Sequence, residues 1–200
     1  MTSNCEPLQE GSIHQDPHFE GLDGTSFFFG GTPGRVFSLI SDADLQLNAA
    51  FVRFPKLGDY LGRIGLRSQD ANLVFDPSFG VFFNGSLVTS GAHELHGAAS
   101  FSVEMVDNRP RFQFRDEKWT ITIRAGTERG NRADVYSNIQ VVNHIFTNPM
   151  GLIGRTAQPE GSATGLPLRE ADYVVHDGIL GIETALGRFA WDVDSDGTNM

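Results

Sequence analysis

The sequence predicts an all-β protein, an antiparallel β-sandwich or flattened barrel of about ten short strands with little helix. Turn-forming residues are frequent, with 23 glycines and 9 prolines in 200 residues. Between them lie short runs rich in Phe, Val, Ile and Thr, and several of these alternate with the period of a half-buried strand. No long stretch shows helical periodicity. Short strands separated by regular turns favour a sandwich or barrel over a helical architecture.

The expected strands follow one another along the chain. We predict them at residues 25–29, 35–41, 45–54, 60–68, 72–75, 80–84, 86–89, 99–106, 119–124 and 134–144. In residues 45–54, apolar side chains occupy the odd positions up to Phe51, whereas Gln46 and Asn48 belong to the opposite face. Residues 119–124 alternate in the same way, beginning with Trp119.

Three turns separate the strands most clearly. Asn84-Gly85 is the strongest hairpin signal, because this dipeptide supplies the positive φ angles of a type I′ turn. Residues 30–34 and 106–110, each rich in turn formers, predict two further tight connections. Residues 27–29 are three consecutive phenylalanines. Because adjacent strand residues face opposite ways, either both faces of this strand are covered or Phe28 lines a pocket or sticky surface. Core packing is the favoured alternative.

The length suits one domain with tails. We expect a flexible leader at residues 1–13, a β domain at residues 14–190 and an acidic tail at residues 191–200. The segment from Met1 to Gly11 contains no Lys, no Arg and no apolar run, so no signal peptide is expected there. This favours an intracellular or a trimmed form. No apolar run approaches the roughly 18 residues of a membrane-spanning helix.

Charge and cysteine content exclude further classes. Lys and Arg number 15 against 25 Asp and Glu, which gives a net charge of −10. Nucleic acid is not an expected partner, because phosphate contacts need basic clusters, and Arg109, Arg111 and Arg115 form the only one apparent. Cys5 is the single cysteine, so the chain can form neither an intrachain disulfide nor a cysteine-based zinc site.

Several segments carry a family resemblance. Residues 16–19 (Asp-Pro-His-Phe), 22–25 (Leu-Asp-Gly-Thr) and 27–29 resemble the opening of von Willebrand factor type D domains. Together with residues 37–42, 45–49, 151–156 and 184–189, they make the chain most similar to the plant root cap family, a cysteine-poor offshoot of that domain. The resemblance implies a secreted, β-rich module for adhesion, assembly or cell-surface binding, without chemistry of its own.

The chain departs from that family at two places. Ser38 and Thr184 stand where the family has cysteines, which fits either folding in a reducing compartment or a lineage that dispenses with the bridge. The calcium loop of type D domains would fall at residues 157–162, where Glu160 is the only carboxylate, so we predict no calcium site there. For the opening motif we predict structural roles, with Asp16, His18 and Asp23 forming turns and packing.

His93, Glu94 and His96 form the densest group of potential metal ligands. On a strand the two histidines would point to opposite faces, whereas a loop, which the flanking glycines favour, would let them converge. With His144 or His176 as a further ligand, such a group would suit Zn²⁺ or another transition metal. The alternative interpretation is a polar surface loop.

Other chemistry finds little support in the sequence. Asp192, Asp194 and Asp196 match the first half of an EF-hand loop, but the closing Glu is missing, which favours a solvated acidic tail. Asp116 and Glu117 are interpreted as a solvated polar turn. Neither a nucleophile elbow nor a phosphate-binding glycine loop is present. We therefore predict no catalytic residue and no cofactor.

Two functional hypotheses follow. The favoured one is a non-catalytic binding or interaction module with a protein or glycan partner, as the resemblance implies. The alternative is a small-molecule-binding protein or small enzyme that uses an apolar pocket lined by Phe and His residues. A meeting of two or more of His93, His96, His144 and His176 in one cavity would favour the alternative, because histidines can supply acid–base catalysis.

Overall fold

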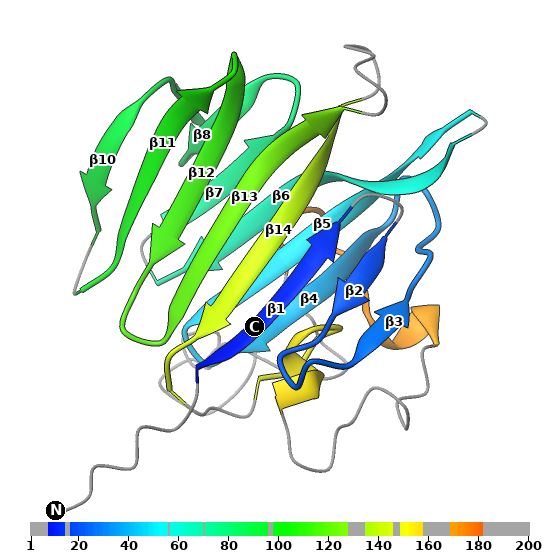
Figure 1. Ribbon diagram of the computed structural model, residues 1–200. Helices are drawn as coiled ribbons and strands as arrows, with labels where there is room; N and C mark the ends of the chain where they lie inside the picture. Colours follow the sequence, from blue (N-terminus) through cyan, green and yellow to red (C-terminus); the bar gives the residue numbers. More distant parts are fainter. Residues whose placement is uncertain are drawn as a thin grey trace, which may run out of the picture.

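The chain folds into two antiparallel β-sheets that pack face to face (Figure 1). The computed structural model describes residues 8–14, 17–55, 57–69, 71–95, 98–127, 135–145, 149–157 and 169–181. The architecture is an all-β sandwich, and this confirms the predicted fold class. We call the two layers sheet A, with eight strands, and sheet B, with seven.

Neighbouring strands in each sheet are connected mostly by hairpins. In spatial order, sheet A contains β10 (Gly91–Glu94), β11 (Ser100–Val106), β12 (Arg109–Arg115), β13 (Trp119–Thr127), β14 (Val135–Asn143), β1 (Gln9–His14), β2 (His18–Glu20) and β3 (Ser26–Phe28). In the same way, sheet B contains β15 (Val174–Val175), β4 (Val36–Asp42), β5 (Leu45–Phe54), β6 (Gly58–Ser68), β7 (Ala71–Asp76), β8 (Gly80–Phe83) and β9 (Ser86–Val88). Between β14 and β15, the described residues include two short 3₁₀ turns, η2 (Gly154–Ala157) and η4 (Glu170–Asp172).

The predicted hairpin turns are confirmed by their backbone angles. Asn84 and Gly85 have φ values of 46° and 84°, as a type I′ turn requires, and they connect β8 with β9. In the β11–β12 turn, Asp107 and Asn108 have φ values of 51° and 60°. Both turns are two residues long, so each fixes the register of its hairpin.

All ten predicted strands are present, but the described residues form fifteen. The prediction of a flexible leader at residues 1–13 is wrong for residues 9–13, which form most of β1 between β14 and β2. Gly11 and Ser12 give this strand no apolar signature. It is held by backbone pairing on both sides and by Ile13, which is fully buried in the core. The prediction also lacked β2, β10, β12 and β15, most of which are too short to show a periodic pattern.

The core lies between the sheets and is rich in aromatic side chains. Under β2 and β3, the Phe29 ring contacts Phe37, Phe51 and Tyr173, with ring centroids 5.4 to 6.0 Å apart. Such edge-to-face arrangements add to the stabilisation from burial alone. Phe28 lies on the opposite face of its strand and is 59% exposed. The favoured prediction of core packing is therefore wrong for Phe28, because this face of β3 is uncovered in the described structure.

Three of the described segments that carry the sequence resemblance, residues 22–25, 37–42 and 151–156, are joined by hydrogen bonds. The Ile153 N–H donates to the Leu39 carbonyl at 2.8 Å, which places residues 150–153 along β4 beyond β15. Thr156 Oγ1 accepts the Leu22 N–H at 2.7 Å and donates to the Ile153 carbonyl at 2.6 Å. Residues 151–156 therefore connect the opening motif to sheet B.

Within the opening motif, Asp23 has the structural role that was predicted. Its carboxylate accepts the Thr25 N–H at 2.9 Å and the Thr25 hydroxyl at 2.7 Å, which fixes the turn before β3. His18 is exposed on β2, directly opposite His14 and Phe28 on the adjacent strands. Asp16 lies outside the described residues.

The outer face of sheet B holds a buried polar network. Gln46 Nε2 donates to Ser38 Oγ at 2.9 Å and to Asn48 Oδ1 at 2.6 Å. Asn48 Nδ2 then donates to the carbonyls of Ile179 and Gly181 at 3.0 and 2.8 Å. The backbone at Ile179 and Gly181 therefore covers the polar face of β5, which carries Gln46 and Asn48. Ser38, where the sequence resemblance leads us to expect a cysteine, thus has a hydrogen-bonding role, whereas Thr184 lies outside the described residues.

Candidate functional site

Polar contacts join the two sheets at one end of the sandwich. Trp119, fully buried at the start of β13, donates its indole N–H to Asp42 of sheet B at 3.0 Å. Next to it, the Lys118 ammonium forms an ion pair with Asp44. The Asp116 carboxylate accepts the N–H groups of Lys118 and Trp119 at 2.8 and 2.6 Å. We call these five residues the inter-sheet clamp.

The clamp corrects the interpretation of Asp116 as part of a solvated polar turn. Its carboxylate is partly buried, and this burial raises the pKa of Asp116 above its ordinary value, although the two backbone hydrogen bonds oppose the shift. Glu117, in contrast, is exposed as expected. The buried carboxylate is required here because it satisfies the N–H groups at the turn into β13.

From the Lys118–Asp44 ion pair of the clamp, we predict that the folded protein loses stability at alkaline pH. The hydrogen bond to Asp44 raises the pKa of Lys118 above its ordinary 10.5. A lysine with a raised folded-state pKa contributes stability that is fully present below the unfolded-state pKa and is lost as the pH rises through the folded-state value. We expect Lys118→Gln to melt lower than the native protein near neutral pH. The difference should shrink above about pH 10.5, as followed by circular dichroism. A difference that stays constant into the alkaline range would contradict this account.

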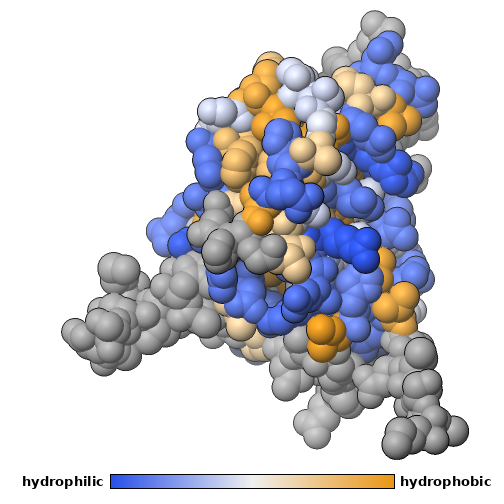
Figure 2. Space-filling model, turned by 90° about the vertical axis from the view of Figure 1, so that its left-hand side faces the viewer, coloured by the Kyte–Doolittle hydropathy of each residue, from blue (hydrophilic) through white to orange (hydrophobic). Residues whose placement is uncertain are grey.

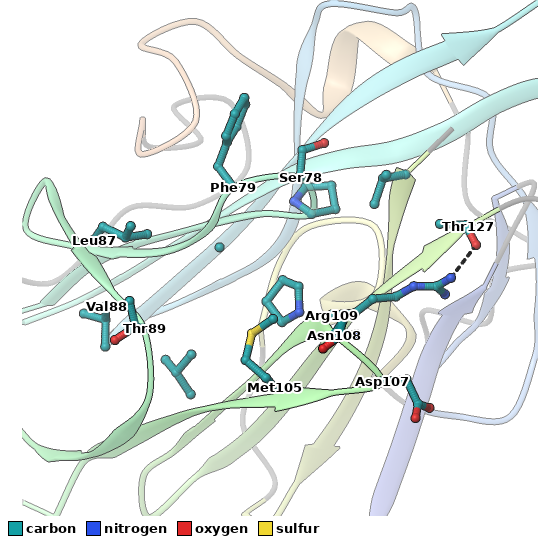
Figure 3. Close-up of a pocket in the computed structure, with 15 residues that line it drawn as sticks. Ser78, Phe79, Leu87, Val88, Thr89, Met105, Asp107, Asn108, Arg109 and Thr127 are labelled. Atoms are coloured by element: carbon teal, nitrogen blue, oxygen red, sulfur yellow. Dashed lines mark hydrogen bonds between the residues drawn. The ribbon is translucent and has the colours of Figure 1, made fainter. Parts of the chain in front are cut away.

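At the opposite end, the two layers open into a cleft of about 670 Å³ (Figure 3). Its walls come from the β7–β8 turn, from β9, from the β11–β12 hairpin and from the facing ends of β13 and β14. The apolar side chains of the lining are those of Pro77, Phe79, Leu87, Val88, Val103, Met105, Pro110 and Val135. A volume of this size is within the range of small-molecule sites.

Tight turns position the apolar side chains of the cleft. Asp76 Oδ1 accepts the N–H groups of Ser78 and Phe79 at 2.9 and 3.2 Å, which fixes the β7–β8 turn and holds Phe79 at its tip. Leu87 comes two residues after the Asn84-Gly85 turn. Met105 lies just before the Asp107-Asn108 turn. The backbone at all three places is therefore fixed by turn chemistry rather than by core packing.

The apolar residues at the mouth of the cleft are unusually exposed. Phe79 is 74% exposed, Met105 57% and Leu87 54%. Figure 2, which views the molecule from the β10 edge, shows apolar side chains gathered in the upper half and mainly hydrophilic ones below. Large exposed apolar groups that adjoin one another typically mark a binding site, because covering them is favourable.

One wall of the cleft carries a cation. Arg109, the first residue of β12, extends along the cleft to Thr127, and its Nη2 donates to Thr127 Oγ1 at 2.8 Å (Figure 3). Asp107 and Asn108 complete this polar side. Among the described residues that line the cleft, apolar side chains thus occur together with one guanidinium, that of Arg109.

Two of the three predicted metal ligands, His93 and Glu94, lie in the described structure, and their side chains point to opposite faces of one strand. His93 and Glu94 are consecutive residues of β10. The His93 ring stacks on Phe101, with centroids 4.6 Å apart, whereas Glu94 is exposed on the other face. The expected loop is therefore a strand at these two positions, because β10 pairs with β11. His96 lies outside the described residues.

The additional candidate ligands lie elsewhere. His144 follows β14, three intervening strands away from β10 and so roughly 19 Å along the sheet, and its Nε2 is hydrogen-bonded to Thr120 Oγ1 at 2.8 Å. His176 follows β15, at the far edge of sheet B. Among the described residues, no three His, Cys, Asp or Glu side chains form a group that could hold a metal ion. Cys5, Asp192, Asp194 and Asp196 lie outside the described part.

Sequence reasoning missed the cleft. Met105 falls within the predicted strand 99–106, and residue 79 lies between the predicted strands 72–75 and 80–84. The available signal was an apolar residue at the tip of a turn, in the run Asp76-Pro77-Ser78-Phe79-Gly80. Such a residue cannot reach the core of its own sheet, so it must be exposed or covered by a ligand.

The fold and the cleft together define an all-β sandwich with an apolar site at one end. No protein family model and no curated protein matches the chain. None of the helical segments that the structure describes is long and apolar enough to span a membrane.

Proposed function

We propose that this chain is a non-catalytic binding module of the von Willebrand factor type D or root cap type, which holds an apolar group of its ligand in the cleft. The observation that carries the proposal is the convergence of Phe79, Leu87 and Met105 around one cavity while each is more than half exposed. Their burial by a ligand would release water from apolar surface, at roughly 25 cal/mol per Å².

The family part of the proposal is supported by the sequence resemblance. The residues that carry it, including Asp23, Leu39 and Thr156, form turns and inter-segment hydrogen bonds, as expected of a motif that specifies a fold. The resemblance alone implies a protein or glycan partner. The apolar lining of the cleft favours a hydrocarbon group as the part that is bound.

The alternative of a small enzyme would need histidines in one cavity. The residues that line the cleft in the described part of the chain include no histidine, and His93, His144 and His176 occupy three separate places. The small-molecule half of that alternative fits the cleft, whereas the acid–base half has no support from these positions. We therefore assign no catalytic residue.

Replacing Phe79 with serine tests the proposed site. Phe79→Ser should weaken the binding of Nile red, an uncharged fluorescent dye, about tenfold, because a phenylalanine contributes roughly 1.5–3 kcal/mol when it is covered. The substitution should leave the melting temperature unchanged, since the ring makes little contact with the core. Fluorescence titration gives the affinity.

Phe28→Ser is the matched control. Phe28 is a comparably exposed phenylalanine on β3, at the far edge of sheet A from the cleft. This variant should bind the dye as the native protein does. Equal affinities of the two variants, or a loss confined to Phe28→Ser, would refute the assignment of the cleft as the binding site.

A further inference from the structure

In the described structure, the Arg109 guanidinium that lines the cleft has few hydrogen-bond partners and no ion-pair partner. Arg109 lines the cleft at the β11–β12 turn, and its guanidinium donates to the neutral hydroxyl of Thr127. Among the described residues, no carboxylate lies within ion-pair distance of it. A guanidinium has five N–H donors in a fixed plane, a geometry that matches the two oxygens of a carboxylate. Most of these donors are therefore available to a ligand.

Two more arginines lie next to it, on the same hairpin and on the neighbouring strand. A smaller hollow of about 240 Å³ shares Asp107, Arg109 and Pro110 with the cleft and is also lined by Arg111 and Arg124. Arg111 stands directly opposite Arg124 across the β12–β13 ladder. Like charges in such positions repel each other. Within the described part of the chain, Arg111 is paired with Glu104 at 2.9 Å, whereas Arg124 has no ion-pair partner.

The local charge contrasts with that of the whole chain. The net charge is −10, yet three arginines line the hollow at the β11–β12 turn. In the described part of the chain, Asp107 shares this lining, and Glu104 pairs with Arg111. Opposite charges near a site attract the ligand and fix its orientation. An anion bound at Arg109 would neutralise the positive charge that its guanidinium places at the mouth of the apolar cleft.

From this juxtaposition we propose that the ligand of the cleft is a free anionic amphiphile, a single hydrocarbon chain with a carboxylate or similar head group. The chain would lie among Phe79, Leu87 and Met105, and the head group would accept hydrogen bonds from Arg109. Figure 3 shows this division, with Arg109 on one side of the cleft and Phe79 and Leu87 on the other. The inference rests on the proposed function, since it names the ligand class of the same cleft.

The test compares dodecanoate with dodecanol, which share a chain and differ in charge. Isothermal titration calorimetry of the full chain should show that dodecanoate binds about tenfold more tightly. Arg109→Gln should remove this advantage and leave the dodecanol affinity unchanged, whereas Arg109→Lys should keep part of it. Arg115→Gln, an exposed arginine at the other end of the same strand, should bind both compounds as the native protein does.

The outcomes separate the two proposals. If both compounds bind equally, or if Arg109→Gln leaves the dodecanoate affinity unchanged, the anionic head group is refuted while the apolar cleft stands. If neither compound binds the native protein and the dye response does not depend on Phe79, the proposed function fails as well. Binding to vesicles of phosphatidylglycerol without binding to free dodecanoate would also overturn the inference, because a membrane surface would then be the ligand.

Discussion

Gly151→Ala is expected to lower the free energy of unfolding by about 3 kcal/mol or more. Gly151 has φ of +90°, a conformation that a residue with a side chain adopts only with strain. A methyl group there would also lie 2.7 Å from the backbone C and O atoms of Leu39. Neither group can move away without breaking the hydrogen bonds between β4 and residues 150–153. Urea unfolding followed by circular dichroism measures the loss.

Gly34→Ala separates the two causes. Gly34 has nearly the same backbone conformation, with φ of +83°, but a methyl group there would meet no atom within 4 Å. Its substitution should therefore cost only the conformational strain, about 1 kcal/mol. The difference between the two variants measures how tightly residues 150–153 pack on β4. If both variants lose the same stability, this packing does not hold the fold together.

Trp119→Ala is expected to lower the free energy of unfolding by about 3–5 kcal/mol, because it leaves a large cavity where the two sheets meet. Trp119 is fully buried, and its indole N–H also bonds to Asp42 across the sheets. Both the packing and the hydrogen bond of the clamp are then lost. Urea unfolding of the variant and the native protein gives the difference.

Trp119→Phe is the informative comparison for the clamp. It keeps most of the aromatic packing and removes the N–H donor, so its loss should be about 1–2 kcal/mol. Asp42 is only partly buried, and water can therefore solvate the carboxylate once the indole is gone. A Phe variant as unstable as the Ala variant would show that the hydrogen bond, rather than the packing, holds this end of the sandwich.

The strands with strong periodicity could be predicted from the sequence. Residues 45–54 match β5 at both ends, and Asn84-Gly85 forms the turn that its chemistry demands. Strands β1 and β10 could not be predicted in this way, because Gly11, Ser12 and Gly91 give no alternation. These strands form because the adjacent strands carry backbone N–H and C=O groups that need hydrogen-bond partners. Sequence patterns report local preference, whereas these two strands are fixed by tertiary pairing with their neighbours.

The candidate site was less accessible to sequence reasoning than the fold. The sequence drew attention to His93 and Glu94 by residue type, yet alternation on a strand directs their side chains to opposite faces. It also singled out Arg109 in a basic cluster with Arg111 and Arg115, but it did not indicate the proximity of Arg124 and Thr127. The proximity of Phe79, Leu87 and Met105 arises from three turns that only the packing of the two sheets brings together.

The most direct test of the cleft as a binding site is an NMR titration of the ¹⁵N-labelled chain with dodecanoate. We expect amide shift changes concentrated in the β7–β8 turn, in β9 and at the β11–β12 turn, including Phe79, Leu87 and Arg109. The inter-sheet clamp at Trp119, at the other end of the sandwich, should remain unaffected. Changes centred on Phe28 and β1–β3, or no change at all at saturating ligand, would contradict the account.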